Sequence, residues 1–129
     1  MTNQCISNAD EQRSERFFLR RDWIAFLFAS LISFLLYLLT MSPTVTLEDS
    51  GEMAVAADYL GVPHPPGYPL WTMLAWLFTR ILSFARYMGQ PNPAWGVSVM
   101  SAFFGALTAG VTAMLVSKMG RKNFLQNNP

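Results

Sequence analysis

The sequence predicts an all-α integral membrane fold with about three transmembrane helices and a short amphipathic helix in the first outward loop. Hydrophobic residues make up 52 % of the 129 residues and charged residues only 13 %, about half the charged share of an ordinary soluble domain. The charges are also unevenly placed, since none stands between Asp22 and Glu48 or between Arg86 and Lys118. A chain of this length forms one small domain at most, and soluble domains rarely leave such long uncharged stretches.

Several classes of protein are excluded by composition and motifs. The formal net charge of +1 gives no strong positive field, which argues against binding of nucleic acid. The one cysteine, Cys5, lies in a polar stretch, so neither an internal disulfide nor a cysteine-based zinc site is expected. No nucleotide-binding glycine loop, nucleophile elbow or zinc-helix motif appears.

The first predicted span covers residues 24–41, which include three polar residues, Ser30, Ser33 and Thr40. A helix of that length is about 27 Å long, close to the roughly 30 Å hydrocarbon core of a bilayer. Residues 1–16 before it are expected to form a disordered polar tail, and the membrane region to cover 17–117. A cleaved signal peptide is the disfavoured alternative, because the apolar run is too long and no A-x-A-like site follows it.

The loop at 42–68 contains four acids and no Lys or Arg. Within it, apolar residues at helical spacing predict a short helix over 51–60, and the prolines of residues 61–69 exclude regular structure. A second, shorter span is expected over about 69–84, followed by a turn at 87–93. A third is expected over 95–116, where small residues every four positions favour close packing with other transmembrane helices.

The distribution of Lys and Arg predicts a cytoplasmic N-terminus and places loop 42–68 on the outer, periplasmic or luminal side. Three spans then leave six basic residues inside and three outside. The inner residues are Arg13, Arg16, Arg20, Arg21, Arg80 and Arg86, and the outer ones are Lys118, Arg121 and Lys122. The basic C-terminal end does not fit this orientation, and we expect the polar residues 118–129 to be the truncated end of a longer membrane protein.

Three acids within five residues, Glu48, Asp49 and Glu52, follow the first span. A carboxylate there can act as a general base or hold a divalent cation. The spacing of Asp49 and Glu52 also fits a helix capping box, with Asp49 as N-cap. Capping is the somewhat favoured interpretation on spacing alone, and the two roles are compatible.

His64, the one histidine, stands between prolines. A histidine in such a loop is usually solvated, and no metal site is predicted, although His64 with Asp49 and Glu52 could complete a carboxylate–histidine cluster. Tyr68, farther along the same loop, is interpreted as an anchor at the membrane interface.

Two motifs at this spacing, Asp49-Ser50-Gly51-Glu52 and His64-Pro65-Pro66-Gly67-Tyr68-Pro69, carry a family resemblance. They resemble the start of the domain-of-unknown-function 2723 proteins, a family that includes the transmembrane protein 260 group. The resemblance covers roughly residues 24–116, and the double motif is specific where a lone D-S-G-E would not be.

This resemblance implies the start of a GT-C-like fold, the class of integral membrane glycosyltransferases that take sugar from a polyprenyl-phosphate donor. Eukaryotic relatives are linked to protein O-mannosylation. By the resemblance, Asp49 would be the catalytic base toward a hydroxyl of a protein or glycan acceptor, with Glu52 or Glu48 as alternates. His64 and Tyr68 would bind substrate, and no cofactor is implied. Because such enzymes have many more spans, the 129 residues alone are not expected to be a working transferase.

Two alternatives from other classes remain open. The first is a small non-enzymatic membrane subunit or remnant that docks into a larger complex through its small-residue third helix. The second is a transporter fragment in which the three acids gather cations. It is disfavoured, because coupling carboxylates usually lie within spans near the midplane.

Overall fold

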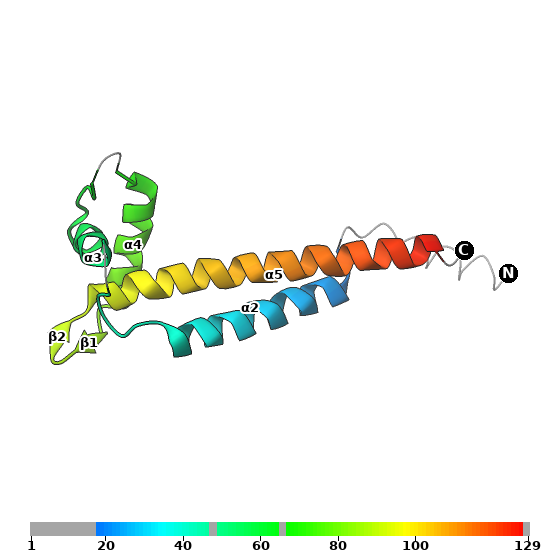
Figure 1. The fold of residues 1–129 in the computed structure, drawn as a ribbon, viewed down its shortest axis with the longest axis horizontal. Coiled ribbons are helices and arrows are strands. Elements are labelled where there is room, and N and C mark those ends of the chain that lie inside the picture. The colour runs from blue at the N-terminus through cyan, green and yellow to red at the C-terminus, as the bar shows by residue number, and fades with distance from the viewer. Residues whose placement is uncertain (1–17, 47–48, 65–66, 128–129) are drawn as a thin grey trace. The chain divides into compact units, whose positions relative to one another are not determined.

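The computed structural model describes residues 18–46, 49–64 and 67–127, with side chains to residue 120. The predicted polar tail and Glu48 lie outside these residues. The described chain is mostly helical (Figure 1), with two short strands; the elements are α2 (Arg20–Thr40), α3 (Ser50–Tyr59), α4 (Pro69–Ile81), β1 (Arg86–Tyr87), β2 (Gln90–Pro91) and α5 (Pro93–Asn127). Two compact units divide the chain: the first joins residues up to 31 with those from 107 onward, and the second is residues 32–106.

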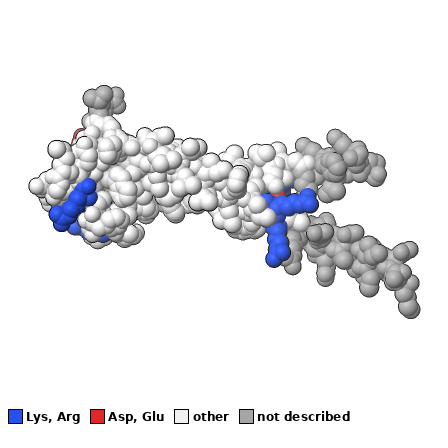
Figure 2. Space-filling model, turned by 90° about the horizontal axis from the view of Figure 1, so that it is seen from below, with Lys and Arg blue, Asp and Glu red and all other residues white. Residues whose placement is uncertain are grey.

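Two of the described helices, α2 and the Pro93–Gly120 part of α5, are long and apolar enough to cross a membrane. No residue in the most apolar 18-residue stretch of α2 is buried inside the protein, whereas about a third of the residues in the corresponding stretch of α5 are buried. On the face drawn in Figure 2, the long helices show an extended stretch without Lys, Arg, Asp or Glu. The helices predicted for residues 24–41 and 95–116 are confirmed, and α2 ends at Thr40, one residue before the predicted limit.

The second span, expected over about 69–84, is not confirmed. Helix α4 has 13 residues, from Pro69 to Ile81, and is therefore only about 20 Å long. The Leu82 amide still donates to the Phe78 carbonyl at 2.9 Å, and the chain then turns, with the Ala85 amide donating to the Leu82 carbonyl at 2.9 Å. Leu82 is thus the last residue to continue the helical hydrogen bonding.

Helix α3 matches the short helix predicted over 51–60 to within one residue at each end. It ends because Leu60 adopts a left-handed conformation with φ of 53°, and the Gly61 amide donates to the Ala56 carbonyl at 2.9 Å. Such left-handed residues are a common way for a helix to terminate.

Small residues allow α3, α4 and the start of α5 to pack closely (Figure 1). Ala57, Ala75 and Met100, one from each helix, are buried together. A Cβ added to Gly96 of α5 would lie 3.0 Å from the Thr79 Cα of α4. Phe78 of α4 also stacks against two rings of α5, Phe103 and Phe104, at centroid distances of 5.9 and 6.4 Å.

The segment predicted as a turn at 87–93 overlaps the antiparallel pair β1 and β2, which is joined through Met88 and Gly89, both with positive φ. Asn92 follows the hairpin and joins it to the end of α2. Its side-chain Nδ2 donates to the Pro43 carbonyl at 2.6 Å, and its amide donates to the Ala85 carbonyl at 3.1 Å. The residues just after α2 and just before α5 therefore lie together within the second unit.

The small residues of α5 find partners in α2 within each unit. In the first unit, a Cβ on Gly110 would overlap the Ser30 Oγ and lie 2.9 Å from the Phe26 carbonyl oxygen. In the second unit, a Cβ on Gly105 would lie 3.1 Å from the Tyr37 ring. Close approach of this kind is what small residues permit in transmembrane helices. These glycines therefore pack inside the chain, which weakens the alternative of a subunit that docks through this helix.

Candidate functional site

The first motif, Asp49-Ser50-Gly51-Glu52, forms the N-terminal end of α3. Ser50 fixes this end to the preceding segment, since its Oγ donates to the Thr46 carbonyl at 2.7 Å and accepts from the Thr46 amide at 3.0 Å. The spacing of the motif did not predict this role for Ser50. A serine immediately before the predicted helix over 51–60 is the signal that would have found it, because its hydroxyl can bind nearby backbone.

The capping-box interpretation of Asp49 and Glu52 is correct in position and wrong in hydrogen bonding. Asp49 is the N-cap residue, and its carbonyl accepts from the Met53 amide at 2.9 Å, but its side chain makes no capping hydrogen bond. The Glu52 carboxylate, which a capping box would direct back to Asp49, is bound to His64. The Asp49 carboxylate is therefore exposed and is not needed to close the helix.

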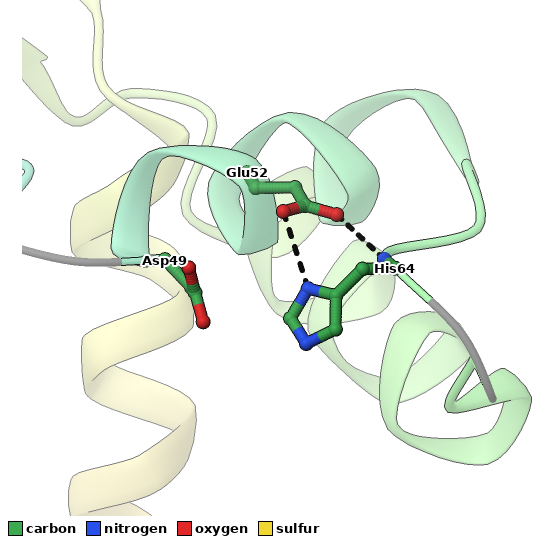
Figure 3. Close-up of side chains that lie close together, drawn as sticks. All are labelled: Asp49, Glu52 and His64. Atoms are coloured by element: carbon green, nitrogen blue, oxygen red, sulfur yellow. Dashed lines mark hydrogen bonds and ion pairs between the residues drawn. The ribbon is translucent and has the colours of Figure 1, made fainter.

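Glu52 and His64 join the two motifs across twelve positions of sequence (Figure 3). The His64 backbone amide donates to Glu52 Oε1 at 2.5 Å, and the His64 Nδ1 lies 3.2 Å from Glu52 Oε2. Both side chains are a little under half exposed. The backbone hydrogen bond from His64, followed by the side-chain hydrogen bond, lowers the pKa of the Glu52 carboxyl. Glu52 is thereby held as a carboxylate.

This arrangement fixes the orientation of the imidazole. A charged Glu52 accepts a hydrogen from Nδ1, which assigns the neutral ring the tautomer with an open Nε2. Figure 3 shows Asp49 across from the ring, on the same side of α3. One ligand-type atom from each of Asp49, Glu52 and His64 lies within 4.8 Å of the others. We call these three residues the acid–histidine cluster.

The acid–histidine cluster has donors of a kind that bind divalent cations. Two features distinguish this cluster from a closed metal site. All three side chains are exposed, and both Glu52 oxygens already accept hydrogen bonds from His64. The arrangement suits a carboxylate base beside an oriented imidazole.

Tyr68, the other residue expected to bind substrate, lies at the N-cap of α4. It helps to line a mostly apolar hollow of about 320 Å³, together with Leu60, Val62, Pro63, Thr72 and Met73. The structure thus brings Asp49, Glu52 and His64 together, and places Tyr68 on the hollow that the second motif helps to form.

Residues 49–129 match the family described as the protein O-mannosyl-transferase TMEM260 N-terminal domain. The chain belongs to this family. The resemblance that the two motifs carry is thereby confirmed, since both motifs lie inside the matched residues. Glu48, the alternate base, lies one position before them.

Two relatives are much longer than this chain. It is 35 % identical over 102 residues to "Protein O-mannosyl-transferase tmem260" of Dictyostelium discoideum, covering 77 % of this chain and 12 % of the relative. It is 36 % identical over 83 residues to "Protein O-mannosyl-transferase TMEM260" of Mus musculus, covering 64 % of this chain and 11 % of the relative. The chain therefore spans about an eighth of the length of these relatives, and no solved structure matches it.

Proposed function

We propose that this chain forms the N-terminal part of a membrane glycosyltransferase that transfers mannose from a polyprenyl-phosphate donor to a protein hydroxyl. The names of its relatives and its two apolar helices support this proposal. The observation that carries it is the acid–histidine cluster, because residues from two separate motifs meet at one exposed place. Further sequence, of the kind that the relatives have, would complete the donor and acceptor sites.

In this proposal Asp49 is the general base. Its carboxylate takes the proton from an acceptor Ser or Thr hydroxyl while that oxygen attacks the anomeric carbon of the donor sugar. The new C–O bond forms as the bond from the anomeric carbon to the lipid phosphate breaks, and the electron pair leaves with the phosphate, inverting the anomeric centre. An exposed carboxylate that makes no capping hydrogen bond is suited to this role.

In this proposal Glu52 positions the His64 ring, and His64 binds the substrate. Glu52 is a weaker candidate for the base because both of its oxygens accept hydrogen bonds from His64. His64 would present Nε2 to a sugar hydroxyl, and Tyr68 would offer its ring at the apolar hollow. Glu48 remains the second alternate for the base.

The fold and location belong to the same proposal. We expect the start of a GT-C-like fold in a multi-pass membrane protein, with the N-terminus in the cytoplasm and loop 42–68 on the outer or luminal side. The protein acceptor and the lipid-linked donor are then the expected partners, and both would reach the acid–histidine cluster from that side.

The test compares Asp49→Asn with Asp58→Asn, the same chemical change at the other end of α3. Both variants are made in the longer protein that begins with these residues, and the transfer of labelled mannose from polyprenyl-phosphate mannose to a Ser/Thr peptide is measured in membranes. We expect Asp49→Asn to lose about 100-fold or more of the rate, with insertion and expression unchanged, and Asp58→Asn to retain it. Transfer unchanged in Asp49→Asn would remove Asp49 from the role.

A further inference from the structure

The hydrogen bond from Asn92 to Pro43 constrains how the chain crosses a membrane. Pro43 lies three residues after the end of α2, and Asn92 lies one residue before the start of α5, so a 2.6 Å contact puts both on the same face of the bilayer. The chain between them must then cross the membrane an even number of times. Because α4 is the one helix in that interval that was expected to cross, it cannot do so alone.

The side chains of α4 also indicate its surroundings. Its small and polar residues, Thr72, Ala75 and Thr79, are buried against protein. The Thr72 hydroxyl donates to the carbonyl of the N-cap residue Tyr68, and the Thr79 hydroxyl to the Trp76 carbonyl of α4. Large apolar side chains, between 45 % and 72 % exposed, cover its opposite face: Leu70, Met73, Leu77 and Ile81. At helical spacing these four residues form one stripe, which we call the α4 apolar face.

The last turn of α4 is held by the loop helix α3. The Arg80 guanidinium donates to the Asp58 carbonyl at 3.1 Å, near the C-terminal end of α3. It also lies over the Trp76 ring, with Cζ 5.6 Å from the centroid. Helix α3 belongs to the polar loop that carries the acids, so this contact keeps the C-terminal end of α4 on the same side of the membrane as that loop. A membrane-spanning α4 would instead have its C-terminal end on the opposite side.

The distribution of basic residues fits the positive-inside rule better when α4 does not cross the membrane. Two crossings, by α2 and α5, bring both ends of the chain to one side, and seven basic residues then lie on the cytoplasmic side. They are Arg13, Arg16, Arg20, Arg21, Lys118, Arg121 and Lys122. Arg80 and Arg86 remain outside. Seven against two satisfies the positive-inside rule better than six against three, and it accounts for the basic C-terminal end.

A contact in the first unit agrees with this arrangement. The Ser117 hydroxyl donates to the Asp22 Oδ1 at 2.7 Å, and the Leu19 amide donates to the Asp22 Oδ2 at 2.9 Å. The start of α2 and residue 117 of α5 therefore lie together, as two crossings in opposite directions require.

We propose that α4 lies along the outer surface of the bilayer with its apolar face, Leu70, Met73, Leu77 and Ile81, against lipid, and that α2 and α5 are the two crossings. The lipid surface is the chosen partner because α4 packs directly on α5, so its apolar face continues the apolar surface of that candidate span. A helix whose apolar side is exposed in this way binds in the interfacial plane of a membrane. This holds whether or not Asp49 is a catalytic base.

The first test locates the two ends of the chain. Three proteins with a single cysteine are compared. The first is the native protein with Cys5, and the other two are Cys5→Ser variants that carry either Val62→Cys or Asn128→Cys. Each is placed in sealed vesicles of one orientation and treated with a membrane-impermeant maleimide. We expect positions 5 and 128 to be labelled from the same side and position 62 from the opposite side. Labelling of position 128 from the side of position 62 would mean three crossings and would overturn the proposal.

The second test measures the depth of α4. A fluorophore on Leu77→Cys, in the Cys5→Ser protein, is quenched by lipids that carry a nitroxide either at the headgroup or near the chain terminus. We expect stronger quenching at Leu77 by the headgroup nitroxide, and stronger quenching by the deep nitroxide at Leu31→Cys, an exposed control inside α2. Deep quenching at Leu77 would place α4 across the membrane, and no quenching by either lipid would remove α4 from the membrane surface. Either result contradicts the proposal.

Discussion

At the scale of single residues, the site depends on one contact that sequence spacing could not reveal. The acids and His64 were all identified as candidates, but the spacing of Asp49 and Glu52 predicted a local partner three residues away. His64 displaces that partner because it offers Glu52 two donors, its backbone amide and its Nδ1. The path of the chain between α3 and His64 brings them together, and no local pattern encodes that path.

The pKa of Glu52 provides a prediction at this scale. Because the pKa of Glu52 is lowered in the folded protein, the contact with His64 stabilises the fold at pH values above the ordinary carboxyl pKa. This stabilisation is lost as the pH falls through the lowered pKa. His64→Ala removes the ring and keeps the amide, so the pKa of Glu52 should rise only part of the way to its ordinary value. A ¹³C NMR titration of the Glu52 carboxyl checks both proteins, and an ordinary pKa in the unchanged protein would contradict the contact.

Asp49 should contribute little to stability. N-cap residues usually contribute about 1 kcal/mol through their side-chain hydrogen bond, and Asp49 makes none. We expect Asp49→Ala to lower the free energy of unfolding by well under about 1 kcal/mol. Ser50→Ala should cost about 1 kcal/mol, because it removes both bonds to Thr46. Denaturant unfolding in detergent measures both, and the reverse ranking would restore the capping role of Asp49.

At the scale of elements, the presence of α2, α3 and α5 was predictable and the fate of α4 was not. The limits of α3 were predicted to within one residue, whereas α2 begins before residue 24 and α5 continues past residue 116. The apolar run over 69–84 resembled a short span because composition alone does not tell which face of a helix is buried. In the structure the buried face consists of Thr72, Ala75 and Thr79, and the large apolar residues that dominated the count point outward.

Gly96 tests the packing of α4 on α5. A Cβ there would lie 3.0 Å from the Thr79 Cα and 3.3 Å from its nitrogen, and backbone atoms cannot move aside as the end of a side chain can. We expect Gly96→Ala to lower the free energy of unfolding by about 1–3 kcal/mol. Gly120→Ala in the same helix is the matched control, since its Cβ would meet nothing within 4 Å. Equal effects of the two changes in thermal unfolding would contradict the close packing.

At the scale of the whole molecule, each unit holds a side-chain hydrogen bond between residues far apart in the sequence. Asn92 with Pro43 belongs to the second unit, and Ser117 with Asp22 to the first. Sequence analysis missed both, because their partners are 49 and 95 positions apart. It therefore could not decide on which side the C-terminal end lies.

These two contacts should act independently. Asn92→Ala and Ser117→Ala each remove one side-chain donor, and we expect each to cost about 1 kcal/mol. Because the contacts share no partner, the double variant should lose the sum to within about 0.5 kcal/mol. Unfolding of the two single variants and the double variant in the same detergent measures this. A double variant no less stable than either single one would show that the contacts form one network.

The bond between Asn92 and Pro43 also bears on how the protein is made. In the proposed arrangement of two crossings, the whole segment between Pro43 and Asn92 would be exported through the membrane before Glu52 can meet His64. The acid–histidine cluster would then be assembled on the far side of the membrane. Under this proposal, the acidity that Glu52 experiences would be that of the outer or luminal compartment.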